Sequence, residues 1–198
     1  MKAVILDKSW LEERRRMGGD RRDEMWDGVL HMVPSPTPEH QRYSDDLRDA
    51  LKARGRAKGL ESFFETDLHR PGARGKDYRQ PDLMFVQPER IIPGQRIEAP
   101  ADLVVEVLSP GDESEEKLEF YADVGCLEAF YVDPKTCAFT LYRLTDGELV
   151  AQRPGSRGLA RCETLDVTFA TRKGPKLEIT WDGGRATVEP FVPRRKKS

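Results

Sequence analysis

Hydrophobic residues along the chain fall mostly in short runs, and the segments between these runs contain Gly, Pro or Asp. This pattern is typical of β-strands joined by turns. The run at 101–108 is the most apolar of them and ends at Ser109-Pro110-Gly111. Strands are predicted at 24–33 (a pair), 60–68, 83–86, 101–108, 129–132, 139–144, 148–151, 177–181 and 186–188. The dipeptides Asp27-Gly28 and Asp146-Gly147 predict tight turns between paired strands.

Three segments are predicted to be helical, at residues 7–18, 39–58 and 112–124. In the second, Tyr43, Leu47 and Leu51 fall on one helical face. The opposite face is basic, and it either contacts phosphates or is simply solvated; its residues are Arg42, Arg48, Lys52, Arg54 and Arg56. The stretches 69–80 and 91–99 are predicted to be loops. This order of elements predicts an α/β or α+β fold with helices against a mixed sheet.

The length of 198 residues suits one domain, and neither a repeat nor a linker is apparent. We expect an N-terminal helix within residues 1–19, a single domain over residues 20–190 with extra C-terminal hairpins, and a disordered basic tail at 191–198. No apolar run is long enough for a membrane helix, and the start of the chain does not resemble a secretory signal.

Composition narrows the class of protein further. A net charge of −2 excludes a broadly basic protein that coats nucleic acid by charge alone. The three cysteines, Cys126, Cys137 and Cys162, lack any CxxC spacing. We expect them to be reduced thiols of a cytoplasmic protein, and neither a disulfide framework nor a zinc site.

The charge is unevenly distributed, and this directs attention to the middle of the chain. Residues 81–150 carry a net charge of −10. Such a segment is either a solvated acidic face or a place where carboxylates gather around a cation. Glu106 lies inside the apolar run LVVEVL, where burial of an unpaired carboxylate costs several kcal/mol. It therefore needs a partner, which is a cation, a basic side chain or solvent at a cleft.

Asp82 follows Pro81 at the start of the preceding strand, and by itself it is typical of an ordinary strand entry. If the two strands are neighbours, the carboxylates of Asp82 and Glu106 converge at one edge of the sheet. Two converging carboxylates repel each other, and a divalent cation removes the repulsion. Oxygen ligands favour Mg²⁺ or Mn²⁺ over Zn²⁺, so the pair indicates a candidate metal site.

Lys117 is an isolated basic residue in this acidic region, one helical turn after Glu113. It either forms a surface pair with Glu113 or points back to the carboxylates. In the second case it would position or deprotonate water and stabilise charge on a phosphate. Glu24 and His40 are, taken alone, typical of a strand-end acid and of a histidine packing at a helix start.

These residues belong to an ordered set of short motifs. The set comprises Glu24-x-x-Asp27-Gly28, Pro38-Glu39-His40, Pro81-Asp82, Val105-Glu106-Val107-Leu108-Ser109-Pro110, Lys117-x-x-x-Tyr121-x-x-x-Gly125 and Tyr131-Val132-Asp133-Pro134. In this order and spacing the chain resembles the Uma family of restriction endonucleases, within the PD-(D/E)XK nuclease superfamily. The resemblance covers roughly residues 20–145 and implies a restriction-endonuclease-like core, a mixed central sheet flanked by helices.

The resemblance also implies roles for the candidate residues. Asp82 and Glu106 match the two acids of the motif and would hold Mg²⁺ or Mn²⁺, with the Val107 carbonyl as a further ligand. Lys117 matches the lysine of the family, displaced from the strand onto the following helix. Leu108 stands where the plain motif would place a lysine, which agrees with that displacement.

Two further residues gain roles from the same resemblance. Glu24 matches the acid of the first core element and would bind a second metal ion or the attacking water. His40 is an accessory candidate near the scissile phosphate.

The function implied in this way is metal-dependent hydrolysis of phosphodiester bonds in DNA, and a homodimer would supply two sites for two strands. A second hypothesis is a binding or regulatory module that keeps the fold without cutting, which the net acidity favours. A third is a structural β-rich scaffold, for which Glu106→Ala would be neutral or stabilising.

Overall fold

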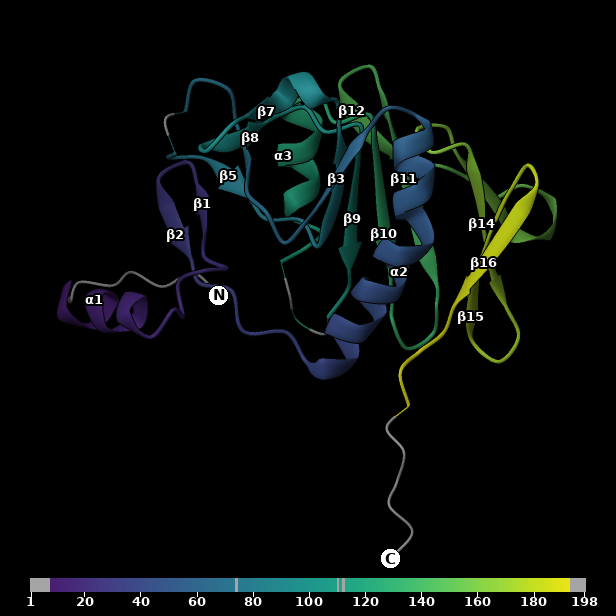
Figure 1. The fold of residues 1–198 in the computed structure, drawn as a ribbon, viewed down its shortest axis with the longest axis horizontal. Helices are drawn as coiled ribbons and strands as arrows, with labels where there is room; N and C mark the ends of the chain where they lie inside the picture. Colours follow the sequence, from purple (N-terminus) through teal and green to yellow (C-terminus); the bar gives the residue numbers. More distant parts are fainter. Residues whose placement is uncertain (1–7, 74, 110, 112, 193–198) are drawn as a thin grey trace, which may run out of the picture.

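The computed structural model describes residues 8–73, 75–109, 111 and 113–192. This part of the chain forms three helices and three β-sheets (Figure 1). The helices are α1 (Lys8–Arg16), α2 (Pro38–Ala57) and α3 (Lys117–Asp123). The mixed α+β architecture agrees with the fold class predicted from the sequence.

The first sheet has the order β2-β1-β5-β4-β8-β7. Its strands are β1 (Glu24–Trp26), β2 (Val29–His31), β4 (Leu68–His69), β5 (Tyr78–Arg79), β7 (Ile91–Ile92) and β8 (Arg96–Glu98). The predicted turn at Asp27-Gly28 joins β1 to β2, and both residues have positive φ angles, 47° and 83°. Those angles suit Asp and Gly, the residues that tolerate this region best.

The central sheet has the order β12-β11-β10-β9-β6-β3. Its strands are β3 (Glu61–Phe64), β6 (Leu83–Val86), β9 (Leu103–Val107), β10 (Glu128–Val132), β11 (Phe139–Thr145) and β12 (Glu148–Ala151). Strand β9 pairs antiparallel with β6 and parallel with β10. A parallel pair requires a crossover connection, and α3 lies in the segment that makes it.

Alternation along β9 assigns its residues to two separate parts of the core. Leu103, Val105 and Val107 belong to the apolar cluster that includes the buried face of α2. Val104 belongs to the cluster that includes α3. Because side chains alternate between the two faces of a strand, Glu106 shares the face of Val104 and lies on the α3 side.

The third sheet has the order β13-β14-β15-β16 and packs against α2. Its strands are β13 (Leu159–Cys162), β14 (Val167–Arg172), β15 (Lys176–Trp181) and β16 (Gly184–Val188). Figure 1 shows this sheet at one end of the molecule, and α1 with the β1–β2 hairpin at the other. The sequence patterns identified β15 and β16 but missed β13 and β14.

Other predicted boundaries were also wrong. The predicted strand 60–68 is divided between β3 and β4, which lie in different sheets, and Glu65 between them has a φ angle of 45°. The predicted loops 69–80 and 91–99 contain β5, β7 and β8, which are too short to show alternation. Helix α3 begins at Lys117, well after the predicted residue 112.

Three further expectations concern the cysteines, membrane helices and the C-terminal tail. Cys126, Cys137 and Cys162 are free and buried. None of the helices in the described part of the chain combines the length and hydrophobicity needed to cross a membrane. Most of the predicted basic tail, residues 193–198, lies outside the described residues.

Gly55 is required where α2 approaches the central sheet. A Cβ atom at this position would lie 2.5 Å from Cδ1 of Phe85 on β6. Helix propensity alone predicts that Gly55→Ala stabilises the protein by about 1 kcal/mol. We expect a loss of about 1–3 kcal/mol instead, since the buried Phe85 ring must move. Chemical denaturation measures the sign, and Phe85→Leu in the same background should recover part of the loss; a more stable Gly55→Ala would contradict this packing.

Candidate active site

Side chains from five segments meet at the C-terminal end of β9. They come from β1, from the segment before β6, from β9 itself, from the N-terminal turn of α2 and from α3. Each of the five segments carries an acid or base that was singled out from the sequence, and β9 contributes the Val107 backbone in addition to Glu106.

The pairing of β6 with β9 places Asp82 beside Glu106. Leu83 is the partner of Val105, so the next position toward this end sets Asp82 opposite Glu106. Oδ2 of Asp82 accepts a hydrogen bond from the Val107 backbone N–H at 2.7 Å. Burial raises the pKa of Glu106 to about 8. The positive charge of Lys117 lowers this pKa, and the negative charge of Asp82 raises it further. The two carboxylates therefore repel each other, as the sequence analysis expected.

Lys117 points inward from the first turn of α3. Its Nζ lies 2.8 Å from Oε1 of Glu24 and 3.3 Å from Oε1 of Glu106. Burial lowers the pKa of Lys117, but the charges of Glu106 and Glu24 outweigh this effect and raise the pKa above its ordinary value. The side chain is therefore a stable ammonium group, which can donate hydrogen bonds and stabilise negative charge but cannot take up a proton.

Glu113, which the sequence offered as a surface partner for Lys117, contacts a different side chain. Residue 113 precedes α3, and Oε2 of Glu113 lies 2.8 Å from Nδ1 of the buried His31 on β2. The β1–β2 hairpin thus contacts the lysine and also the segment that leads into its helix.

Glu24 is fully engaged by hydrogen-bond donors. Its Oε1 accepts from Lys117 and from the Gln80 backbone N–H at 2.8 Å, and its Oε2 accepts from Nε1 of Trp26 at 2.7 Å. The side chain is buried, with 1% exposure. Its contacts are those of a residue that holds Lys117 in place.

His40 contacts the other side of the site. Its Nε2 lies 2.8 Å from the Val107 carbonyl oxygen and 3.3 Å from Oδ2 of Asp82. Thr37, the N-cap of α2, accepts a hydrogen bond from the His40 backbone N–H at 3.2 Å and so fixes this first turn. The imidazole therefore bridges a carboxylate and a carbonyl that the sequence analysis singled out together.

Two residues that support the site, Tyr121 and Trp26, were not assigned a role from the sequence. The hydroxyl of Tyr121 donates to Oε1 of Glu106 at 2.6 Å; its place one turn after Lys117 was noted, but no role was assigned to it. Trp26 donates to Glu24, stacks on His31 with centroids 3.9 Å apart, and lies 4.3 Å below the Arg79 guanidinium. Its position two residues after Glu24 on the same strand was the only available signal.

The chemistry of the acids and the carbonyl fits a hard divalent cation in part. Asp82, Glu106 and the Val107 carbonyl supply oxygen atoms. Burial and the charge of Asp82 raise the pKa of Glu106, and a bound cation would oppose that rise. Among the described residues, no three His, Cys, Asp or Glu side chains are arranged to hold a metal ion by themselves. The Lys117 ammonium contacts Glu24 and Glu106 together, so it occupies the space between these two acids.

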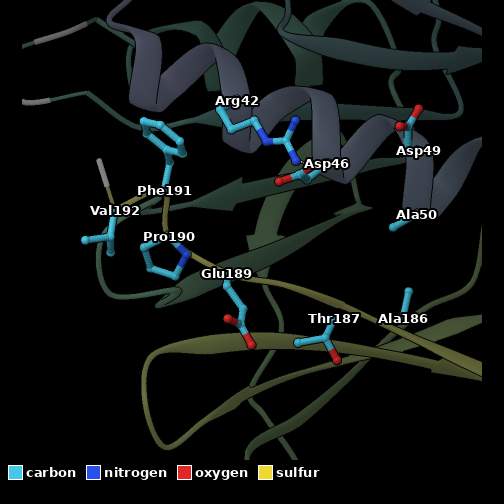
Figure 2. Close-up of a pocket in the computed structure, with 10 residues that line it drawn as sticks. All are labelled: Arg42, Asp46, Asp49, Ala50, Ala186, Thr187, Glu189, Pro190, Phe191 and Val192. Carbon is cyan, nitrogen blue, oxygen red and sulfur yellow. Dashed lines mark ion pairs between the residues drawn. The ribbon is translucent and has the colours of Figure 1, made fainter. Parts of the chain in front are cut away.

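The basic face of α2 is largely used within the protein. Arg42 pairs with Asp46 at 3.2 Å, and Arg48 pairs with Asp45 at 3.0 Å. A hollow of about 510 Å³ lies between α2 and the segment after β16, and Figure 2 shows the Arg42–Asp46 pair on its wall. None of the candidate site residues is among the described residues that line this hollow.

Comparisons with known proteins agree with this architecture. The profile of the Uma2 family, whose description is "Putative restriction endonuclease", matches residues 11–172. No curated protein matches the chain. The crystal structure of a "putative nuclease belonging to DUF820" from Anabaena variabilis superposes with a TM-score of 0.56. It is 17% identical in sequence, and the match covers 72% of this chain and 82% of that one, a likeness in fold.

Proposed function

Because the chain belongs to the Uma2 family, we propose that it is a metal-dependent endonuclease that hydrolyses phosphodiester bonds in DNA. The observation that carries the proposal is the position of the buried Lys117 ammonium, held by Glu24 and Glu106 next to Asp82. A cation beside paired carboxylates is the arrangement expected where negative charge develops on a phosphate. The likeness in fold does not indicate an activity, and the position of Lys117 is the observation that favours phosphodiester hydrolysis.

In this proposal each residue has a defined task. Asp82, Glu106 and the Val107 carbonyl would hold a Mg²⁺ or Mn²⁺ ion, which would supply an activated water and positive charge at the leaving oxygen. Lys117 donates to a phosphate oxygen and stabilises the charge that develops there. Glu24 orients Lys117, a task that its three hydrogen bonds favour over a second metal site.

His40 has a separate task in the proposal. Its Nε2–H contacts the Val107 carbonyl and Asp82, and these contacts orient both oxygens toward the ion. Its position at the N-terminal turn of α2 also leaves it close to where a scissile phosphate would approach the carboxylates.

The full chain is expected to nick supercoiled plasmid in the presence of Mg²⁺ or Mn²⁺, and excess EDTA is expected to stop the reaction because the two acids then lack their ion. Calorimetric metal titration followed by plasmid incubation checks this result, with RNA of matched length as a second substrate. Metal uptake without nicking would contradict the proposal, as would cleavage that persists in EDTA. Preferential cutting of RNA would correct the substrate.

A module that binds without cleaving is a second candidate function, and the distribution of charged side chains favours it. The chain is acidic overall, and the basic side chains Arg42 and Arg48 are paired with acids on their own helix. Such a surface neutralises few phosphates. This module would bind metal or nucleic acid without nicking, and the same experiment distinguishes the two functions.

We also propose that cutting of both strands uses a homodimer, since a single site addresses one strand at a time. Analytical ultracentrifugation of the full chain, with and without plasmid-derived duplex, measures the oligomeric state directly. A chain that stays monomeric while linearising plasmid would show that two successive visits suffice.

A further inference from the structure

Tyr121 makes a contact that the proposed reaction does not yet use. The side chain is fully buried on α3, and its hydroxyl donates to Oε1 of Glu106 at 2.6 Å. Lys117, four residues earlier on the same helix, donates to the same oxygen at 3.3 Å. Residues four apart share a helical face, so α3 places two donors on one carboxylate oxygen.

Two donors on one oxygen restrict the orientation of the carboxylate. With Lys117 and Tyr121 both bonded to Oε1, rotation of the Glu106 carboxyl group would break two hydrogen bonds together. Oε2 of Glu106 accepts no hydrogen bond from the described residues, and the charge of Asp82 acts on this same carboxylate. The anchored oxygen and the unanchored one therefore have different surroundings.

A buried tyrosine hydroxyl needs a partner, but that need alone does not explain this one. Tyr131, also buried, satisfies its hydroxyl with the backbone carbonyl of Ser114 at 2.8 Å. Tyr43 donates to Sγ of Cys137 at 3.5 Å, and Cys137 is not a residue of the candidate site. Of these three buried phenols, Tyr121 is the one whose proton is spent on a carboxylate of the candidate site.

We propose that Tyr121 is a positioning residue that fixes the Glu106 carboxylate and so presents its Oε2 to a divalent ion shared with Asp82. The inference rests on the proposed metal-dependent function and adds to it a residue that acts through Glu106. Groups that hydrogen-bond to metal ligands typically change metal affinity by about 10–100-fold when they are removed.

The test compares Tyr121→Phe with Tyr43→Phe in the full chain. Each substitution removes one buried hydroxyl and keeps the ring, but only the first frees Glu106 to rotate. Calorimetry with Mn²⁺ is expected to give a dissociation constant about tenfold or more weaker for Tyr121→Phe, and an unchanged one for Tyr43→Phe. In plasmid cleavage, Tyr121→Phe should need more Mn²⁺ for half-maximal rate and recover most of its rate at saturating Mn²⁺.

The outcomes separate the two hypotheses. If the unmodified chain takes up no Mn²⁺, the proposed function fails. If it binds Mn²⁺ and Tyr121→Phe binds equally well, the positioning role is overturned and the function stands. Thermal unfolding of both variants without metal is measured alongside; a weaker Mn²⁺ affinity shared equally by Tyr43→Phe would also overturn the proposal, because hydroxyl loss in general would then explain it.

Discussion

Asp82→Ala is expected to abolish metal-dependent plasmid cleavage, with a loss on the order of a thousandfold or more. The substitution removes one of two neighbouring carboxylates, that of Asp82 just before β6, and leaves that of Glu106 on β9. It leaves Glu106 as the remaining acid, which cannot by itself replace the lost ligand oxygens. Measured cleavage rates at saturating Mg²⁺, together with the Mn²⁺ dissociation constant, check the prediction.

Asp102 provides a matched control because it makes the same kind of bond at the opposite end of β9. Its Oδ2 accepts from the Gln87 backbone N–H at 3.1 Å, as Asp82 accepts from that of Val107 at 2.7 Å. Asp102→Ala therefore costs a similar backbone hydrogen bond but should leave metal affinity and cleavage rate intact. Equal activity of the two variants would remove Asp82 from the site, and circular dichroism verifies that both remain folded.

Lys117→Met is expected to inactivate the protein and also to destabilise it by about 3–5 kcal/mol. The reason is that Glu24 and Glu106, both nearly fully buried, would lose the cation that compensates their charges. Urea denaturation without metal measures the free energy of unfolding. Lys58→Met is the control, since Lys58 forms an exposed pair with Asp166 at 3.3 Å that contributes only about 0–1 kcal/mol.

A double-mutant cycle assigns this cost to the buried pair. Glu24→Gln removes one of the two uncompensated charges, so Lys117→Met with Glu24→Gln should be less destabilised than the sum of the two single variants. Additive losses would mean that Glu24 and Lys117 do not interact in the folded protein. A Lys117→Met variant as stable as Lys58→Met would show that the lysine is not buried between the acids.

Glu106 and Glu128 show which buried acids can be recognised from the sequence and which cannot. Both acids are almost fully buried at 2% exposure in neighbouring strands. Glu106 was recognised because it interrupts an apolar run. Glu128, at the boundary of a predicted strand, was not.

Glu128 also shows that burial of an acid does not by itself indicate a reactive site. Its oxygens accept from the backbone N–H groups of Glu163 and Thr164 and from Arg143. These bonds tie the third sheet to β10 and satisfy the charge. Only the identity of the partners, which come from distant parts of the chain, separates this structural role from that of Glu106.

The sequence by itself determined the local features of this protein: the β1–β2 turn, the extent of α2, the apolar strand β9 and the buried acid Glu106 within it. These follow from turn chemistry and from side-chain periodicity, which act over a few residues. It also determined the family, through the order and spacing of motifs that are each short.

Only the tertiary structure decided which charged side chains pair with one another. Lys117 was equally suited by spacing to Glu113, but the fold directs it to Glu24, 93 positions away, and sends Glu113 to His31. Strands β5 and β8 likewise pair with β1 and β4, which are far from them along the chain. Pairings of this kind depend on how the sheets close around the core, which no local pattern of residues encodes.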